Sequence, residues 1–256
     1  MAFVEVSTRR ILIPLAFVAS LLLQCACDEK AASPSTQTAR RVVTTGPAGT
    51  GVIRGTVSFR GTAPGGEEVD GARCHAGAGK IRVSPVEVAP GGGLKDVMVY
   101  VKDPSTVPAV DERLAAPVLD QVYCQYTPRV LGVRVGQVLR VKSSDPTMHN
   151  VHTLSDRNPR LNFGMTGAGQ SRDVSFAAPE QFTVRCDVHP WMSATVYVFD
   201  HPFFAVSGAD GAFEIAGLPP GEQELVFSHP FLGERTRKVT VADGAVTADV
   251  TFEKGQ

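Results

Sequence analysis

The stretch Thr183-Val-Arg-Cys-Asp-Val-His-Pro-Trp-Met192 combines a strand pattern with a short loop. Apolar and polar residues alternate up to Cys186, which indicates a strand whose inward face ends at this cysteine. Pro190 fixes a backbone dihedral in the loop that follows. We expect this loop to return His189 and Met192 to the strand end beside Cys186.

A second segment, Asp145-Pro-Thr-Met-His-Asn-Val-His152, supplies His149, which must come from a different strand end. Two His, one Cys and a weak axial Met form the trigonal arrangement of blue copper sites. The soft thiolate suits both oxidation states of copper, imidazole serves either, and a thioether is a weak ligand that favours Cu(I). The sequence therefore predicts one type 1 copper ion held by His149, Cys186, His189 and Met192.

The position of His152 leaves its role open. It lies three residues after His149 and would point to the opposite face if the strand continues, whereas a loop would bring it to the copper as an additional ligand. A zinc site is disfavoured because no second Cys or His pair stands at ligand spacing. Each side chain alone is more often structural than metal-binding, and it is the joint pattern that favours copper.

This joint pattern resembles the cupredoxin family, which includes plastocyanin, amicyanin and pseudoazurin. The His149-Asn150 pair matches the first ligand of that family, and the Cys-x-x-His-x-x-Met spacing from Cys186 matches its short ligand loop. The resemblance covers residues 104–199 and implies a Greek-key β-sandwich that exchanges electrons with a redox partner protein. It also implies that Asn150 ties the two ligand segments together.

A second resemblance concerns Gly208-Ala-Asp-Gly-Ala-Phe-Glu-Ile-Ala-Gly-Leu-Pro-Pro-Gly221. This line is similar to the carboxypeptidase regulatory-like family, a small transthyretin-like β-sandwich whose opening strand usually reads as Ile53-x-Gly55-x-Val57 does here. The sequence fits two domain orders. One is a tandem of an N-terminal β region (51–103), the cupredoxin-like domain (104–199) and the regulatory-like domain (200–256). The other is a single sandwich that starts in the first region and closes in the last, with the cupredoxin-like domain inserted. Both orders predict an all-β fold.

The N-terminus has the layout of an export signal. Arg9 and Arg10 precede an apolar run at residues 11–23, which is too short for the ~20 apolar residues of a transmembrane helix. A basic start followed by a short apolar run is typical of a secretory signal peptide, which we place at residues 1–26.

The end of this leader resembles a bacterial lipoprotein signal. We expect a lipid anchor on Cys27, with modification of Cys25 or plain secretion as alternatives. Residues 27–50 are rich in Ala, Ser, Thr, Gln and Pro, which predicts a flexible linker. The mature protein would then be exported, periplasmic or at the cell surface, and anchored to the membrane.

Two cysteines remain once the resemblance assigns Cys186 to copper and the leader takes Cys25 and Cys27. An exported chain folds in an oxidising compartment. Cys74 and Cys124 are therefore expected to form a disulfide, with two separate thiols as the alternative.

The composition of the chain and the motifs that it lacks disfavour several classes of function. The 256 residues carry a formal net charge of -1, so no basic excess indicates nucleic-acid binding. An enzyme is the least favoured function, because the extra His pairs of multicopper enzymes and a Ser-His-Asp or paired-carboxylate motif are not evident. We expect an electron carrier; the alternatives are a copper delivery module and a surface lipoprotein with a vestigial site.

Overall fold

The computed structural model describes residues 44–46, 48–74, 78–108, 115–242 and 244–253. The expected signal peptide, both leader cysteines and most of the expected linker lie outside these residues. The described chain consists of strands and their connections with one 3-10 turn, η1 (Gly71–Arg73), and the predicted all-β fold is confirmed. No helix within the described ranges has the length and apolar character needed to cross a membrane. The described part of the expected linker includes β1 (Thr44–Gly46), which pairs in parallel with β6 (Thr106–Pro108).

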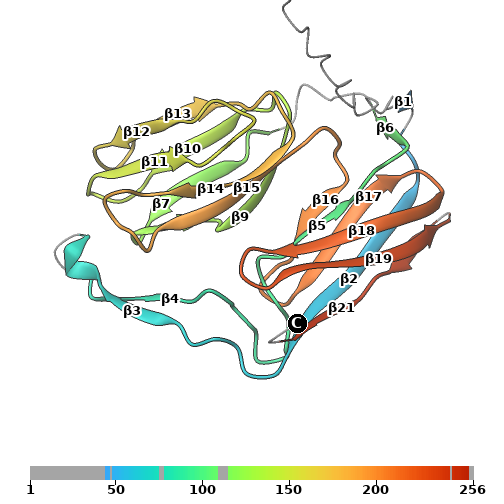
Figure 1. Ribbon diagram of the computed structural model, residues 1–256, viewed down its shortest axis with the longest axis horizontal. Coiled ribbons are helices and arrows are strands. Elements are labelled where there is room, and N and C mark those ends of the chain that lie inside the picture. The colour runs from blue at the N-terminus through green and yellow to red at the C-terminus, as the bar shows by residue number, and fades with distance from the viewer. Residues whose placement is uncertain (1–43, 47, 75–77, 109–114, 243, 254–256) are drawn as a thin grey trace, which may run out of the picture. The chain divides into compact units, whose positions relative to one another are not determined.

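Nine strands form two sheets that we call the nine-stranded sandwich (Figure 1). One sheet has the spatial order β13 (Ser171–Val174), β10 (Leu139–Ser143), β7 (Val118–Val122) and β8 (Gln125–Thr127). The other has the order β12 (Asn162–Met165), β11 (His149–Thr153), β14 (Glu180–Arg185), β15 (Ser193–Phe199) and β9 (Val130–Arg134). Buried apolar side chains from both sheets form one core between them, including Leu119, Val141, Phe182 and Val196.

The strand predicted before the ligand loop is β14, and its burial follows the predicted alternation. Phe182 and Val184 are buried, and the residue after each of them is exposed. β14 pairs antiparallel with both β11 and β15. Because of this pairing, Cys186 at the end of β14 meets the start of β11, which is His149.

Eight further strands form what we call the eight-stranded sandwich. One of its sheets has the order β16 (Phe204–Val206), β5 (Met98–Val101), β18 (Gly221–His229) and β19 (Gly233–Val241). In the other sheet, β2 (Gly51–Arg60) pairs with β17 (Ala212–Leu218) on one edge, and with β20 (Ala245–Thr247) and β21 (Val250–Glu253) along the other. This sandwich has its own core, which includes Ile53, Val57, Phe213 and Leu225.

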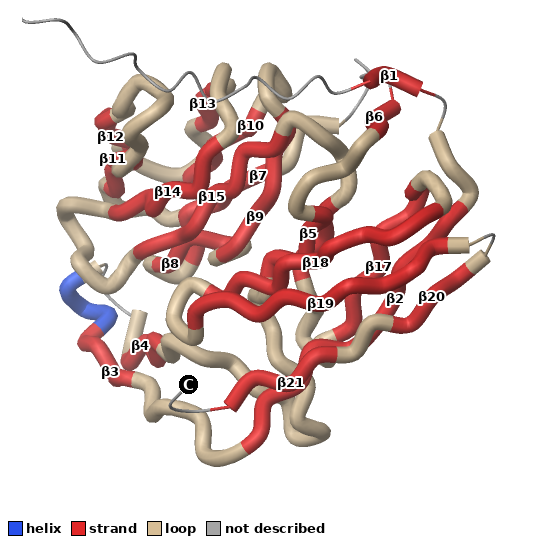
Figure 2. The backbone as a smooth tube through the Cα atoms, turned by 45° about the vertical axis from the view of Figure 1, so that its right-hand side comes forward, coloured by secondary structure: helices blue, strands red, loops and turns tan. Residues whose placement is uncertain are grey.

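The eight-stranded sandwich is interrupted in sequence. β2 and β5 precede every strand of the nine-stranded sandwich, and β16 to β21 follow them, so one sandwich is inserted into the other (Figure 2). The opening strand expected at Ile53-x-Gly55-x-Val57 is β2, in which Ile53, Val57 and Phe59 are buried. Gly55 shares their face and is required there, because a Cβ atom would lie 2.5 Å from the carbonyl oxygen of Ala248.

A hairpin lies between β2 and β5 in the chain. Its strands, β3 (Glu67–Asp70) and β4 (Lys80–Val83), pair only with each other among the described strands. Three of its apolar side chains, Val69, Ile81 and Val83, pack on the core of the nine-stranded sandwich. η1 follows β3, and Cys74 is its C-terminal cap. The hairpin is thus an extension of one sandwich that packs on the other.

Candidate metal centre

Three of the four predicted copper ligands come from two strand ends and one loop. His149 opens β11, Cys186 follows the last residue of β14, and His189 lies on the loop from β14 to β15. Two backbone hydrogen bonds close this loop: the Met192 N–H donates to the His189 carbonyl at 2.9 Å, and the Cys186 N–H donates to the Met192 carbonyl at 3.1 Å. The loop therefore turns back on the strand end, as its sequence predicts.

The donor atoms of His149, Cys186 and His189 all lie within 4.8 Å of one another. The Nδ1 atoms of the two histidines are 3.0 Å apart, and the Cys186 Sγ atom is 3.8 Å from the His189 Nδ1 atom. The three side chains are 0%, 2% and 3% exposed, respectively. Met192, the fourth predicted ligand, is also buried and belongs to the same apolar cluster as Cys186.

These donors fit a single metal ion. Metal bonds to imidazole nitrogen and thiolate sulfur measure about 2.0–2.3 Å, so one ion can contact atoms separated by 3.0 and 3.8 Å. Two ring nitrogens 3.0 Å apart need a proton or a cation between them. One thiolate and two imidazoles, with a buried thioether on the same loop, form a donor set that suits copper.

The protein stabilises Cys186 as a thiolate, which is the form that binds metals. Burial alone would raise the pKa of the thiol. Hydrogen bonds from His149 and from the backbone N–H groups of Asn150, His189 and Val188 outweigh burial and hold the pKa of Cys186 below its ordinary value. The His189 N–H, for example, lies 3.4 Å from the sulfur.

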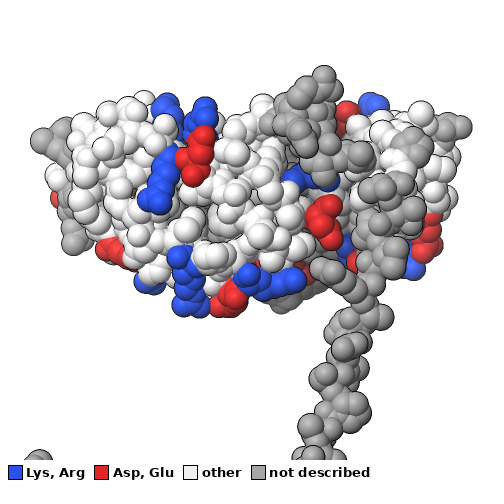
Figure 3. Space-filling model, turned by 90° about the horizontal axis from the view of Figure 1, so that it is seen from above, with Lys and Arg blue, Asp and Glu red and all other residues white. Residues whose placement is uncertain are grey.

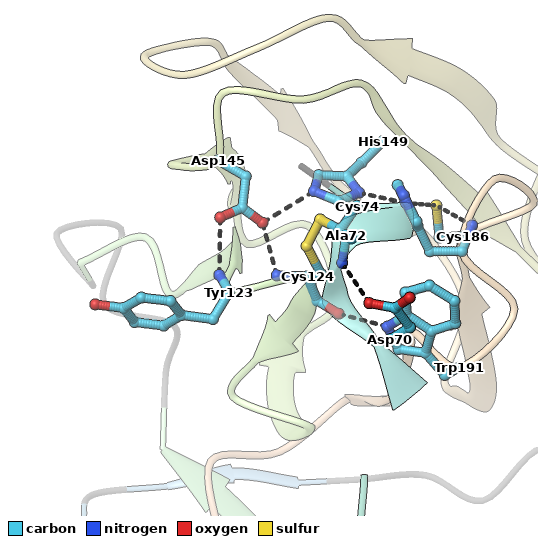
Figure 4. Close-up of a disulfide and its surroundings, with 10 residues drawn as sticks. Asp70, Ala72, Cys74, Tyr123, Cys124, Asp145, His149, Cys186 and Trp191 are labelled. Carbon is cyan, nitrogen blue, oxygen red and sulfur yellow. Dashed lines mark hydrogen bonds and ion pairs between the residues drawn. A yellow bond between two sulfur atoms is a disulfide. The ribbon is translucent and has the colours of Figure 1, made fainter. Parts of the chain in front are cut away.

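Asp145 fixes the orientation of His149, whose ring lies between Asp145 and Cys186 in Figure 4. The Asp145 Oδ2 atom is 3.0 Å from the His149 Nε2 atom, so Nε2 carries a proton and Nδ1 faces the other donors. Burial disfavours the imidazolium, but hydrogen bonds with Cys186 and Asp145 raise the pKa of His149. Both pKa shifts favour the charged forms of Cys186 and His149 relative to isolated side chains, and a cation that binds there competes with the proton.

The same carboxylate also holds a tight turn. Asp145 accepts hydrogen bonds from the N–H groups of Tyr123 and Cys124, both at 2.8 Å. These two residues connect β7 to β8 with φ angles of 53° and 55°, a left-handed conformation that costs non-glycine residues about 1–2 kcal/mol each. Sequence reasoning did not single out Asp145, because a carboxylate before a histidine looks the same whether it is buried or exposed.

The predicted disulfide between Cys74 and Cys124 is confirmed. It joins the end of η1 to the β7–β8 turn. The two sulfurs and the donor atoms of Asp145 and His149 all lie within 4.8 Å of one another. The disulfide is therefore a direct neighbour of the metal centre (Figure 4).

Asn150 lies between the two ligand segments. Its Oδ1 atom accepts a hydrogen bond from the Asp187 N–H, and its Nδ2 group donates to the Asp187 carboxylate at 3.1 Å and to Asn162 at 2.9 Å. The hydroxyl of Tyr126 donates to the carbonyl groups of Asn150 and Arg185. These contacts fix the start of β11 against the end of β14.

The structure does not bring His152 to the other donors. Its Nδ1 atom lies 3.0 Å and 3.2 Å from the two carboxylate oxygens of Asp187, and its side chain is partly exposed. It is not part of the group formed by His149, Cys186 and His189. β11 continues as a strand through this position, so His152 points away from the centre.

Trp191 connects the ligand loop to the disulfide turn. Its Nε1–H donates to the Cys124 carbonyl at 3.0 Å, and its ring centroid lies 5.2 Å from that of His189. The indole is only partly exposed. The side chain thus covers one side of His189.

Comparisons with known proteins give partial likenesses. No family model matches the chain, and no curated protein matches it. A Cu-containing nitrite reductase (NirK) from Thermus scotoductus SA-01 is 20% identical to this chain, with a TM-score of 0.32. The match covers 38% of this chain and 25% of the reductase, so the chain spans about a quarter of that protein. A purple cupredoxin from Nitrosopumilus maritimus is 18% identical with a TM-score of 0.29, over 32% of this chain and 99% of that one. An oxidised amicyanin variant is 22% identical with a TM-score of 0.31, over 40% and 98% of the two chains.

Proposed function

We propose that the chain binds one type 1 copper ion through His149, Cys186, His189 and Met192 and carries electrons to or from a redox partner protein. The observation that carries this proposal is the buried triangle of one sulfur and two Nδ1 atoms. Copper held there would supply a one-electron change between Cu(II) and Cu(I). Two strand ends and a hydrogen-bonded loop hold the donors in nearly one geometry for both states, which favours fast electron transfer.

A carrier fits the surroundings of the centre better than an enzyme does. The cavity that borders Met192 and Trp191 measures about 20 Å³, close to the space that one water molecule requires. The two histidines are buried. This small space favours a site that passes electrons over one that binds a substrate.

The proposed setting is outside the cytoplasm. A disulfide is typical of exported proteins, which supports export through a signal peptide at residues 1–26. The proposed lipid anchor on Cys27 rests on the leader sequence alone. On the face shown in Figure 3, acidic and basic side chains are interspersed, which fits a protein partner better than a nucleic acid. By analogy with the transthyretin-like family, we assign the eight-stranded sandwich a role in anchoring the protein or in docking a partner.

The test is the visible absorption spectrum of the purified protein after addition of Cu(II), with Cys186→Ser as the control. We expect an intense thiolate-to-copper band in the wild-type protein, absent from the control and reversibly bleached by a mild reductant. A colourless protein that retains no copper would overturn the proposal. Copper that leaves to a competing chelator as soon as it is reduced would instead indicate a delivery module.

A further inference from the structure

Cys124 is linked through one intermediate residue to each of the two histidines of the metal centre. Its N–H donates at 2.8 Å to Asp145, whose carboxylate lies 3.0 Å from His149. Its carbonyl accepts at 3.0 Å from Trp191, whose ring lies 5.2 Å from that of His189. A displacement of Cys124 would therefore reach both ligand segments.

The β3–β4 hairpin is fixed at its two ends in different ways. At its base, Arg129 donates hydrogen bonds to the carbonyl groups of Ser84 and Pro85. At its far end, the disulfide from Cys74 to Cys124 is the covalent link to the nine-stranded sandwich. Among the described strands, β3 and β4 pair only with each other, so no sheet hydrogen bonding replaces this link.

The hairpin covers the ligand loop. Val83 of β4 borders the same small cavity as Tyr126, Trp191 and Met192. The disulfide lies against Asp145 and His149, as Figure 4 shows. Burial of the metal centre on this side therefore depends on the hairpin remaining docked.

We propose that the Cys74–Cys124 disulfide is a clasp that keeps the metal centre closed, and that its reduction opens the centre to metal exchange and to thiol reagents. The left-handed Tyr123–Cys124 turn is held by the Asp145 carboxylate and by this disulfide. When the disulfide opens, the far end of the hairpin loses its covalent link and keeps only the apolar packing of β3 and β4 on the core. The turn is then held by its hydrogen bonds to Asp145 and Trp191. The part of this inference that concerns metal rests on the proposed function, and the part that concerns access to Cys186 does not.

Opening follows dithiol–disulfide exchange with a protein or small molecule that carries two vicinal thiols. The sulfur–sulfur bond between Cys74 and Cys124 breaks and both become thiols. The reductant supplies two electrons and two protons, and its own thiols become a disulfide. Cys186 keeps its oxidation state throughout.

The test uses the full chain with Cys25→Ser and Cys27→Ser, so that Cys186 is the reduced cysteine in the closed form. The open form is mimicked by adding Cys74→Ser and Cys124→Ser together. The first measurement is the rate at which a maleimide alkylates Cys186 in the metal-free protein. The second is the rate at which bound copper passes to a competing chelator. Leu225→Ala, in the core of the eight-stranded sandwich, is the control for a general loss of stability.

We expect alkylation and copper loss to be at least tenfold faster in the open form than in the closed form, with the Leu225→Ala control close to the closed form. Tryptic cleavage after the exposed Lys80 and Arg82 should also become faster in the open form. Equal alkylation rates in the open and closed forms would overturn the clasp. Failure of the closed form to bind copper would overturn the proposed function instead, and the alkylation rates would still decide whether the clasp exists.

Discussion

The Nε2 atom of His149 lies 3.0 Å from the Oδ2 atom of Asp145, and both side chains are buried. This contact decides which ring nitrogen of His149 faces the other donors. The same carboxylate accepts the N–H groups of Tyr123 and Cys124. One side chain thus positions a metal ligand and stabilises the turn that carries the disulfide.

Replacement of Asp145 by Asn should weaken metal binding. The amide cannot accept all three hydrogen bonds as a carboxylate does, so His149 loses its fixed tautomer and orientation. Loss of such an outer partner typically lowers metal affinity about 10–100-fold. A competition titration with a copper chelator would measure this change. Asp173→Asn is the matched control, because Asp173 is an exposed carboxylate paired with Arg140; equal affinities for both variants would contradict the role of Asp145.

The two candidate nitrogen ligands that differ most in placement are His152 and His189. His152→Gln should leave the thiolate-to-copper band nearly unchanged, because this ring contacts Asp187 and not the other donors. His189→Gln should abolish the band or change its shape, because its Nδ1 atom lies within the donor triangle. Absorption spectra of the two copper-loaded variants make the comparison. Loss of the band in His152→Gln would place this residue on the metal.

The disulfide should contribute substantially to stability. It closes a loop with a sequence separation of 50 residues, for which the loop-entropy relation gives about 4 kcal/mol. Urea unfolding of the metal-free protein, with and without the Cys74→Ser and Cys124→Ser changes, measures this difference. A loss below about 1 kcal/mol would mean that the unfolded chain is already restrained by other contacts.

A buried histidine outside the metal centre should make stability depend on pH. His229 ends β18 and its Nδ1 atom accepts the N–H groups of Phe231 and Leu232 at 3.1 and 3.2 Å. Burial, aided by the charge of Arg129, lowers the pKa of His229 to about 4. The unfolded chain, with an ordinary pKa near 6.5, then binds the proton more tightly, so stability is full above about pH 6.5 and falls as the pH decreases toward 4.

The shift in the pKa of His229 corresponds to about 3 kcal/mol once the pH reaches the folded-state value. Urea unfolding of the wild-type protein and of His229→Gln between pH 7.5 and 4.5 tests this. The variant should be less stable at pH 7.5, since it loses the acceptor for two N–H groups, and the difference should shrink as the pH falls. A difference for His229→Gln that stays constant with pH would rule out the linkage.

Sequence patterns identified the strands that have one buried face. β2 and β14 were predicted because residues of one face, Ile53 and Val57 in one strand and Phe182 and Val184 in the other, stand an even number of positions apart. All four are buried. β13 could not be found in this way. It is an edge strand whose residues are mostly exposed, so its sequence carries no alternation, and its pairing with β10 includes an ion pair between Asp173 and Arg140.

In the candidate site, too, only the features that lie within one short segment could be predicted from the sequence. The spacing of Cys186, His189 and Met192 lies within one short segment, so local sequence was enough to predict the loop. The roles of Asp145 and of the Tyr123–Cys124 turn depend on segments that meet only in the folded chain. Neither turn residue is a Gly or Asn, the types that usually mark a left-handed turn, so no local pattern indicates this turn.

The interrupted sandwich has a consequence for the order of folding. The hydroxyl groups of Ser58 and Thr251 lie 2.8 Å apart although 193 positions separate them in the chain. As the exported chain emerges N-terminus first, β7 to β15 become available before β20 and β21, so the sandwich with the metal ligands can fold while the long edge of β2 has no partner. Unpaired strand edges are where growing chains associate wrongly. We therefore expect the arrival of the last strands, more than the assembly of the ligands, to decide how much of the newly made protein escapes aggregation.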